Sequence, residues 1–255
     1  MKFIDTHCHL YLPEFKNDIS GVFLRAEAAG IEKFYLPAID SSVNHDLLEM
    51  ERQYPEKCFA MMGLHPCSVN ENFETELSAV EKLIDQRTFV AIGEIGLDFY
   101  WSTTFLDQQY LAFEKQMHWA FQKNRPIVIH TRSAMKETIE FVKPFSDKGL
   151  KGIFHCFGDS YENAVKIIEM GFLLGIGGVV TYKKSGLDEI VKKINLEHIV
   201  LETDAPYLTP VPYRGKRNES SYIKFIAEKI ADIKNIPLEE VAAITTNNAE
   251  IIFGK

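Results

Sequence analysis

Two histidines near the start of the chain, His7 and His9, flank a single residue, Cys8. In an extended strand, alternate side chains point to the same face, so both imidazoles would face one point. Neutral imidazole nitrogens are common metal ligands. Asp5 lies on the same face and could orient one of these ligands. Ordinary polar residues at a strand end show the same spacing, so this motif needs support from the rest of the chain.

Four more metal-binding side chain types follow apolar segments further along the chain. Glu94 ends the run VAIGE, His130 ends PIVIH, His155 follows GIF, and Asp204 follows VLET. Each alone would usually be a structural polar residue. Because the active sites of barrel enzymes lie at the carboxyl ends of the strands, the whole set indicates a metal centre.

Six ligands are too many for one tetrahedral ion, but they suit two neighbouring ions that share a carboxylate. Glu94, on the middle strand of the set, is the natural bridge. We therefore predict two divalent metal ions per chain. The nitrogen and oxygen ligands admit Zn, Mn, Fe or Ni, and Mg less naturally, and the sequence does not choose among them.

The elements that would position these ligands are eight short apolar segments. Several are near-continuous hydrophobic runs, such as FVAIG and FLLGIGG, which are typical of parallel strands buried on both faces. The segments cover residues 2–9, 33–39, 58–65, 89–97, 126–131, 152–157, 172–177 and 199–203.

Amphipathic segments separate most of these predicted strands. Residues 105–123 and 160–170 have apolar residues at helical spacing, and Ser160 is a helix-capping residue at the start of the second. Two further helices are predicted over residues 220–233 and 237–252. Eight alternations favour an α/β fold of the (β/α)8 TIM barrel type over an open sheet, as a single domain over residues 1–255 with extra C-terminal helices.

Composition agrees with a globular protein of this kind. The chain has 255 residues, of which 46% are hydrophobic and 25% charged. Its start, MKFIDTHCHL, lacks the apolar stretch of a signal peptide, no window is long enough for a membrane span, and four scattered cysteines fit reduced thiols. We therefore expect a cytoplasmic protein without disulfides.

The net charge of −8 argues against a protein that coats nucleic acid, although a local binding site remains possible.

Seven segments of the chain, in order, resemble the signature segments of the TatD-type metal-dependent deoxyribonucleases of the amidohydrolase superfamily. They are FIDTHCHL, GLHP, GEIGLDF, PIVIHTR, HCFGD, LETDAPYL and PYRGKRNES, from residue 3 to about residue 220. The resemblance implies a water between two ions as nucleophile, with Asp204 accepting its proton. It also implies one ion held by His7, His9, Glu94 and Asp204 and a second held by Glu94, His130 and His155.

The chain departs from the family pattern at three positions. Cys67 stands where histidine is frequent, Ser133 where an acidic residue is common, and Ser220 where proline is common. None of the three is a predicted ligand. These departures therefore bear on substrate preference more than on hydrolysis.

Other polar residues are expected around the metals. His65 ends the third predicted strand and could contact the substrate or its leaving group, and Glu202 shares a strand face with Asp204 and could lie beneath the metals. Cationic side chains at the barrel mouth suit phosphate binding, since arginine can make two parallel hydrogen bonds to phosphate oxygens. The predicted phosphate-binding residues are Arg132, Arg214, Lys216 and Arg217.

Three functions fit these residues. The resemblance implies a phosphodiesterase that removes nucleotides from DNA, with 3′ to 5′ polarity, and single strands or ends would reach a recessed site most easily. Phe99, Tyr100, Trp101 and Tyr207 could stack on bases. The same metals could instead cleave an ester or amide, as in a D-aminoacyl-tRNA deacylase or a small-molecule amidohydrolase. A metal-binding protein without turnover is the third reading. No obligate protein partner and no membrane partner are expected.

Overall fold

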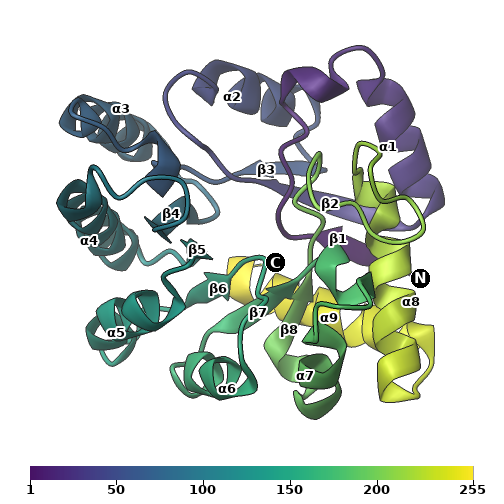
Figure 1. Cartoon of the computed structure of the whole chain (residues 1–255). Helices are drawn as coiled ribbons and strands as arrows, with labels where there is room; N and C mark the ends of the chain where they lie inside the picture. Colours follow the sequence, from purple (N-terminus) through teal and green to yellow (C-terminus); the bar gives the residue numbers. More distant parts are fainter. Residues whose placement is uncertain (255) are drawn as a thin grey trace.

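Eight short parallel strands surround the centre of the molecule, and helices cover them on the outside (Figure 1). The computed structural model describes residues 1–254. The strands are β1 (Phe3–Asp5), β2 (Ile31–Leu36), β3 (Cys58–Ala60), β4 (Ile92–Asp98), β5 (Ile127–Arg132), β6 (Gly152–Phe154), β7 (Leu173–Ile176) and β8 (Ile199–Leu201).

The strands form two parallel sheets, β1 to β3 and β4 to β8, which meet at two seams. At one seam Met62 forms a parallel bridge with Ile92, and at the other Cys8 forms one with Ala205. The second seam also has a backbone hydrogen bond from the N–H of Thr6 to the carbonyl of Leu201, at 3.0 Å. With both seams bridged, the strands make a ring, and the predicted (β/α)8 barrel is confirmed.

Within residues 1–254, one α-helix follows each strand, and a ninth follows the helix after β8. Four of the helices match the predicted segments within one to three residues, and Ser160 caps its helix by accepting the N–H of Asn163 at 3.2 Å. The helices are α1 (Ile19–Ala28), α2 (Asn44–Gln53), α3 (Phe73–Gln86), α4 (Leu106–Lys123), α5 (Met135–Ser146), α6 (Tyr161–Glu169), α7 (Leu187–Lys193), α8 (Ile223–Lys234) and α9 (Leu238–Phe253), with five short 3-10 turns between them.

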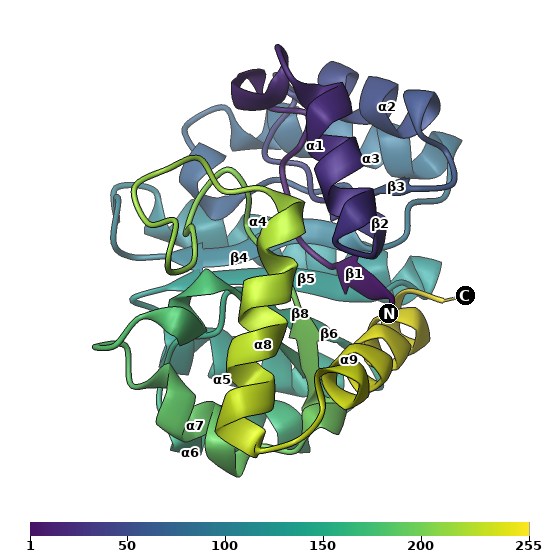
Figure 2. The same cartoon turned by 90° about the vertical axis from the view of Figure 1, so that its right-hand side faces the viewer.

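The last helix, α9, closes the end of the barrel where the strands begin. Phe253 stacks on Tyr35 of β2, with ring centroids 3.9 Å apart. Together with Ala249 it joins an apolar cluster that includes Ile4, Met61 and residues of three further strands. Figure 2 shows α9 and both termini on the side away from the loops that follow β7 and β8. The opposite end of the barrel is therefore the one open to a substrate.

Several strands are shorter than their apolar segments predict. β1 ends at Asp5 rather than at residue 9, β3 at Ala60 rather than at residue 65, and β6 at Phe154 rather than at residue 157. Beyond these points the chain bends into the barrel mouth and its backbone bonds elsewhere; the His7 carbonyl, for example, accepts the N–H of Asp204 at 2.9 Å. No helix within residues 1–254 is long and apolar enough to cross a membrane.

Candidate metal centre

The six predicted ligands come together at the open end of the barrel, and Glu94 lies at their centre. Its Oε2 is 3.2 Å from His7 Nε2 and 3.9 Å from His9 Nε2. Its Oε1 is 2.8 Å from His155 Nε2 and 3.0 Å from His130 Nδ1. Each oxygen of one carboxylate thus faces its own pair of imidazoles, which is the arrangement expected of a bridging ligand.

Asp204 lies beside the first of these pairs. Its Oδ1 is 3.5 Å from His9 Nε2 and 3.8 Å from His7 Nε2. The backbone at Asp204 is left-handed, with φ 57°, a conformation that aspartate tolerates better than most residues. This turn directs the carboxylate back toward the histidines. Burial alone would raise the pKa of Asp204, but His9 and the other histidines hold it below its usual value.

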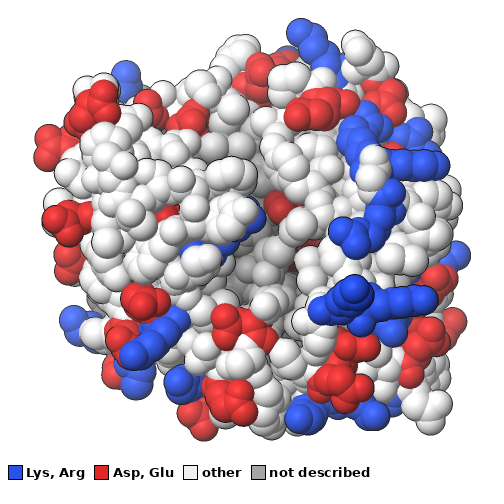
Figure 3. Space-filling view, viewed as in Figure 1, with Lys and Arg blue, Asp and Glu red and all other residues white. Residues whose placement is uncertain are grey.

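Four sets of three ligand atoms lie close enough to hold one ion each; two of these, His65 with Cys67 and His130, and His7 with His155 and Asp204, lack Glu94, and the other two contain it. In each set the atoms are within 4.8 Å of one another. The two sets that contain Glu94 are His7, His9 and Glu94, and Glu94, His130 and His155. Figure 3 shows a hollow on this face with carboxylate atoms inside it.

The chemistry of the cluster fits metal ions. Both ring nitrogens of His7, and Nδ1 of His155, are buried without a hydrogen-bond partner. Such groups are costly to bury unless something binds them. Burial, with the neighbouring His155, lowers the pKa of His7, which keeps its ring neutral. A neutral imidazole offers the lone pair that a metal ion requires.

One member of the site, Asp98, was missed by the sequence analysis. Its Oδ2 is 2.9 Å from Nε2 of His130, whose Nδ1 faces Glu94. A carboxylate that accepts the second ring N–H of a metal-binding histidine fixes the orientation of the ring and makes it a better ligand. The signal was present, because Asp98 lies four residues after Glu94 on β4 and therefore on the same face of the strand.

Asp5 and Glu202 lie next to the cluster, and Asp5 hydrogen-bonds to Thr203 rather than to an imidazole ring. It accepts the backbone N–H of Thr203 at 3.0 Å and the Thr203 hydroxyl at 2.6 Å, and burial raises its pKa to about 7. Glu202 accepts the N–H of Cys156 and lies 3.5 Å from Nδ1 of His155. These two carboxylates hold the segments that carry Asp204 and His155.

His65 is at the edge of the same cluster, with Nε2 3.5 Å from Oε1 of Glu94. Its Nδ1 accepts the backbone N–H of Cys67 at 3.0 Å. A neutral histidine has only one ring proton, so this bond places the proton on Nε2. His65 therefore presents a donor to the site rather than a lone pair for a metal ion.

The predicted phosphate-binding residues lie in different environments. The guanidinium of Arg214 stacks on Tyr182 at 4.1 Å, and Nζ of Lys216 is 5.5 Å from the Tyr213 ring centroid. Arg132 lies over Tyr100, beside the metal ligands. Figure 3 shows Lys and Arg on both sides of the hollow, most of them in a run on the right.

For Arg217 the structure assigns a different role from the predicted one. Its guanidinium donates two hydrogen bonds to the Asp18 carboxylate, at 2.7 and 2.8 Å, and lies on the ring of Phe15. Asp18 also pairs with Arg25, which in turn binds Glu219. Arg217 therefore fastens the loop after β8 to the start of α1, and both of its terminal nitrogens already donate hydrogen bonds within the protein.

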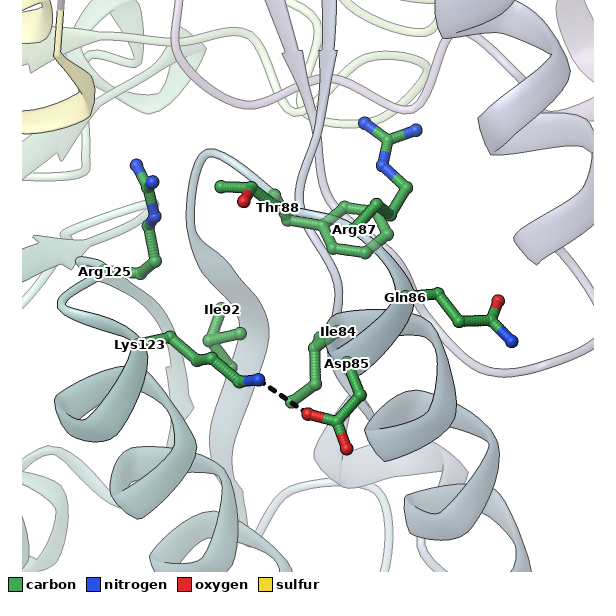
Figure 4. Close-up of a pocket in the computed structure, with 9 residues that line it drawn as sticks. Ile84, Asp85, Gln86, Arg87, Thr88, Ile92, Lys123 and Arg125 are labelled. Atoms are coloured by element: carbon green, nitrogen blue, oxygen red, sulfur yellow. Dashed lines mark hydrogen bonds and ion pairs between the residues drawn. The ribbon is translucent and has the colours of Figure 1, made fainter.

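A separate cavity of about 290 Å³ lies at the opposite end of the barrel, before β4 and β5 (Figure 4). Its lining includes Arg87, Arg125 and Lys123, and Lys123 is paired with Asp85 at 2.6 Å. None of the residues that line it is a histidine or cysteine. The metal-binding chemistry of the described residues is thus at the other end, where the strands finish.

A (β/α)8 barrel that gathers histidines and shared carboxylates at the carboxyl ends of its strands defines a metal-dependent hydrolase. The comparisons with known proteins agree. Residues 4–254 match the model of the family described as TatD related DNase. The chain belongs to this family and is one of its metal-dependent hydrolases.

Individual relatives match over nearly the whole chain. The chain is 38% identical, over 250 residues and 98% of each protein, to the "Uncharacterized metal-dependent hydrolase YabD" of Bacillus subtilis. It is 29% identical, again over 98% of each, to the "3'-5' ssDNA/RNA exonuclease TatD" of Edwardsiella piscicida. The crystal structure of YJJV, a TatD homologue from Escherichia coli, superposes with a TM-score of 0.93 at 26% identity, covering 99% of this chain and 98% of that one.

Proposed function

We propose that this protein hydrolyses phosphodiester bonds of DNA with two divalent metal ions, releasing nucleotides from the 3′ end of single strands. The observation that carries the proposal is the pair of ligand sets that share Glu94. The relative named as a 3′-5′ exonuclease on single-stranded DNA and RNA supports the choice of substrate.

The proposal divides the ligands between the two ions in the way that the resemblance implies, with Glu94 common to both. His7, His9 and Asp204 would complete the first site, and His130 and His155 the second. When bound, two such cations lower the pKa of a water and offset the negative charge that gathers on the reacting phosphoryl group.

Asp204 is the best placed proton acceptor of the cluster. Its side chain is 15% exposed, whereas that of Glu94 is 3% exposed, so Asp204 is the more accessible carboxylate to a water entering from the mouth. The histidines around it hold its pKa below the usual value, which keeps it ionised at neutral pH. It can therefore take the proton of the attacking water.

His65 would act on the other side of the reaction. The N–H of Cys67 leaves the ring proton of His65 on Nε2, which faces the cluster. From there it can donate a hydrogen bond to a phosphate oxygen or to the oxygen of the leaving group. Arg214 and Lys216 would bind phosphates further from the centre.

A substrate survey tests the proposal. End-labelled single- and double-stranded DNA, RNA, an aminoacyl-tRNA and simple esters and amides are each incubated with Mg, Mn or Zn, with a chelator as control. We expect chelator-sensitive release of mononucleotides from single-stranded DNA to exceed all other reactions. Faster cleavage of the aminoacyl ester, or of an amide, would overturn the choice of phosphodiesters, since the same metals serve either chemistry.

Arg214 and Arg217 provide a matched pair for the phosphate contacts. Arg214→Ala should raise the KM for DNA several-fold at low salt and less at high salt, because its contact with phosphate is screened by ions. Arg217→Ala should mainly lower the melting temperature, since Asp18 already engages its guanidinium. Equal changes in KM for the two variants would show that Arg214 has no special place in substrate binding.

A further inference from the structure

Two large aromatic side chains are exposed immediately after β4. The side chains of Tyr100 and Trp101 are 57% and 67% exposed, and their rings meet edge to face with centroids 5.1 Å apart. An exposed tryptophan beside a catalytic cluster is unusual, because burial of its ring is strongly favourable. These two rings offer flat faces to whatever enters the mouth.

Arg132, at the end of β5, lies against both rings. Its guanidinium is 3.8 Å from the centroid of Tyr100 and 5.1 Å from that of Trp101. The rings are the only partners found for this guanidinium among residues 1–254. Stacking on an aromatic face leaves the edge N–H groups of arginine free to bind phosphate oxygens. The two rings thus hold the guanidinium of Arg132 in place, but no carboxylate among the described residues pairs with it.

The carboxylate of Asp98 links these two rings to the candidate metal centre. Oδ1 of Asp98 accepts the backbone N–H groups of Tyr100 and Trp101, at 2.9 and 3.0 Å, and Oδ2 meets His130 Nε2 at 2.9 Å. Arg132 follows His130 by two residues on β5. Asp98 therefore fixes the aromatic turn at a set position relative to the reacting groups.

We propose that Trp101, Tyr100 and Arg132 form a binding site for one unpaired nucleotide of the substrate, next to the bond that is cut. The base stacks on the exposed face of Trp101, the phosphate binds Arg132, and Tyr100 holds the arginine in place. This inference rests on the proposed function and specifies its substrate: a strand whose terminal bases are free to stack, of any sequence.

The chemistry of stacking explains both the preference for an unpaired base and the lack of preference among the four bases. Every base has an aromatic face, so a tryptophan platform binds all four with little preference. In a duplex, the base is already paired and stacked on its neighbours. These contacts must be broken before the base can stack on Trp101 instead. Single strands should therefore bind better than blunt duplexes, without a marked preference for one base.

The two tryptophans of the chain allow a direct test of stacking. Trp119 is buried against α3, so Trp119→Phe leaves Trp101 as the one fluorescent tryptophan. The metal-loaded Trp119→Phe protein is titrated with a phosphorothioate oligothymidylate, which resists hydrolysis. We expect its fluorescence to be quenched as the oligonucleotide binds. An unchanged signal at concentrations that inhibit turnover would overturn the proposal.

Kinetics supply the second test. Trp101→Ala should raise the KM for single-stranded DNA about tenfold with little change in kcat, and Trp101→Phe should restore most of the affinity. An oligonucleotide with abasic residues at its 3′ end should bind the wild type and Trp101→Ala equally weakly. Phe121→Ala, which removes an exposed aromatic ring from the outer helix α4, is the matched control and should behave as wild type.

The outcomes separate the inference from the proposed function. If the wild type degrades single-stranded DNA but Trp101→Ala keeps its KM, the nucleotide site is wrong and the function stands. If the wild type releases no nucleotides from any strand, the proposed function fails, and oligonucleotide quenching of Trp101 would then be absent as well. If Trp101→Ala raised the KM strongly for one terminal base and not for the others, the proposed stacking of any base on Trp101 would be contradicted.

Discussion

The imidazole of His7 lies flat against that of His155, with ring centroids 3.9 Å apart and planes 13° apart. The two rings come from the segments that follow β1 and β6, two strands that are not neighbours in the barrel. Two stacked imidazoles cannot both be protonated at low cost, because like charges at this distance repel each other. A pair held in this way suits metal binding, in which each ring is neutral and offers one nitrogen lone pair to a cation.

Metal content is the first expected consequence. Metal-saturated protein should contain about two divalent ions per chain, because the two ligand sets that contain Glu94 share no other residue. Glu94→Gln should reduce this to one or fewer, since the amide lacks the charge and one of the acceptor oxygens. Elemental analysis after gel filtration measures it. A wild type that never exceeds one ion would contradict the two-ion proposal.

Asp204→Asn should retain the fold and lose most of the turnover. The amide cannot take the proton of a water, and general base catalysis is worth on the order of 10² to 10⁴ in rate. Steady-state kcat at saturating metal is the measurement, with circular dichroism to confirm folding. Activity within about tenfold of the wild type would point to another base, and His65 would be tested next.

Asp98→Asn should weaken metal binding while leaving every direct ligand in place. Loss of a carboxylate behind a metal-binding histidine commonly costs about 10- to 100-fold in affinity. Competition with a fluorescent chelator measures the change. Asp85→Asn, which alters a surface aspartate paired with Lys123 at the far end of the barrel, is the control. If the two variants bound metal with equal affinity, Asp98 would have no part in metal binding.

The ion pairs of Asp18 should contribute to stability in a defined pH range. Hydrogen bonds from Arg217, together with those from Arg25, lower the pKa of Asp18 from 3.8 to about 2. A lowered pKa means that the stabilisation is complete above pH 4 and is lost as the pH falls toward 2. Because the side chain of Asp18 is 41% exposed and its ion pairs are screened by solvent, the effect should stay below about 1 kcal/mol.

Urea unfolding of the wild type and Asp18→Asn between pH 6 and pH 3 measures this effect. The difference in the free energy of unfolding should be constant down to about pH 4 and then shrink. A difference that grows as the solution becomes more acidic would contradict the assigned direction.

Phe253→Ala should destabilise the barrel from its closed end. Phe253 is 6% exposed and stacks on Tyr35, and removal of a buried phenylalanine side chain costs about 3–5 kcal/mol. Ile251→Ala, two residues away and 70% exposed, should cost less than about 0.5 kcal/mol. The free energies of unfolding of the two variants are measured by urea denaturation. A small effect at Phe253 would mean that α9 does not support the ring of strands.

The barrel and the grouping of the candidate ligands could be predicted because both follow simple periodicity. Parallel strands place their carboxyl ends at one edge, so Glu94, His130 and His155 could be grouped although they come from different strands. The strand limits could not be predicted as well. The apolar pattern continues to His9 and His65, but there the chain has left the strand ladder: His9 bonds across a seam to Ala205, and His65 bonds to Ile39. Apolar periodicity does not predict such backbone pairing.

The remaining features depend on contacts between distant parts of the chain. Arg217 and Asp18 are 199 residues apart, so a run of basic residues read alone suggested a free phosphate-binding loop. The bond from the Cys67 N–H to His65 depends on a turn geometry that the residue types do not specify. Asp98 is different, since its place on the face of Glu94 was visible from alternation alone.

The seam between β1 and β8 joins the beginning of the chain to a segment some two hundred residues later, through the bridge of Cys8 with Ala205. His7 and His9 are synthesised nearly two hundred residues before Asp204, the carboxylate beside them, and α9 follows later still. The six side chains of the cluster can therefore come together only after Asp204 has been made, and an early stop codon within α9 would leave the ring unsupported.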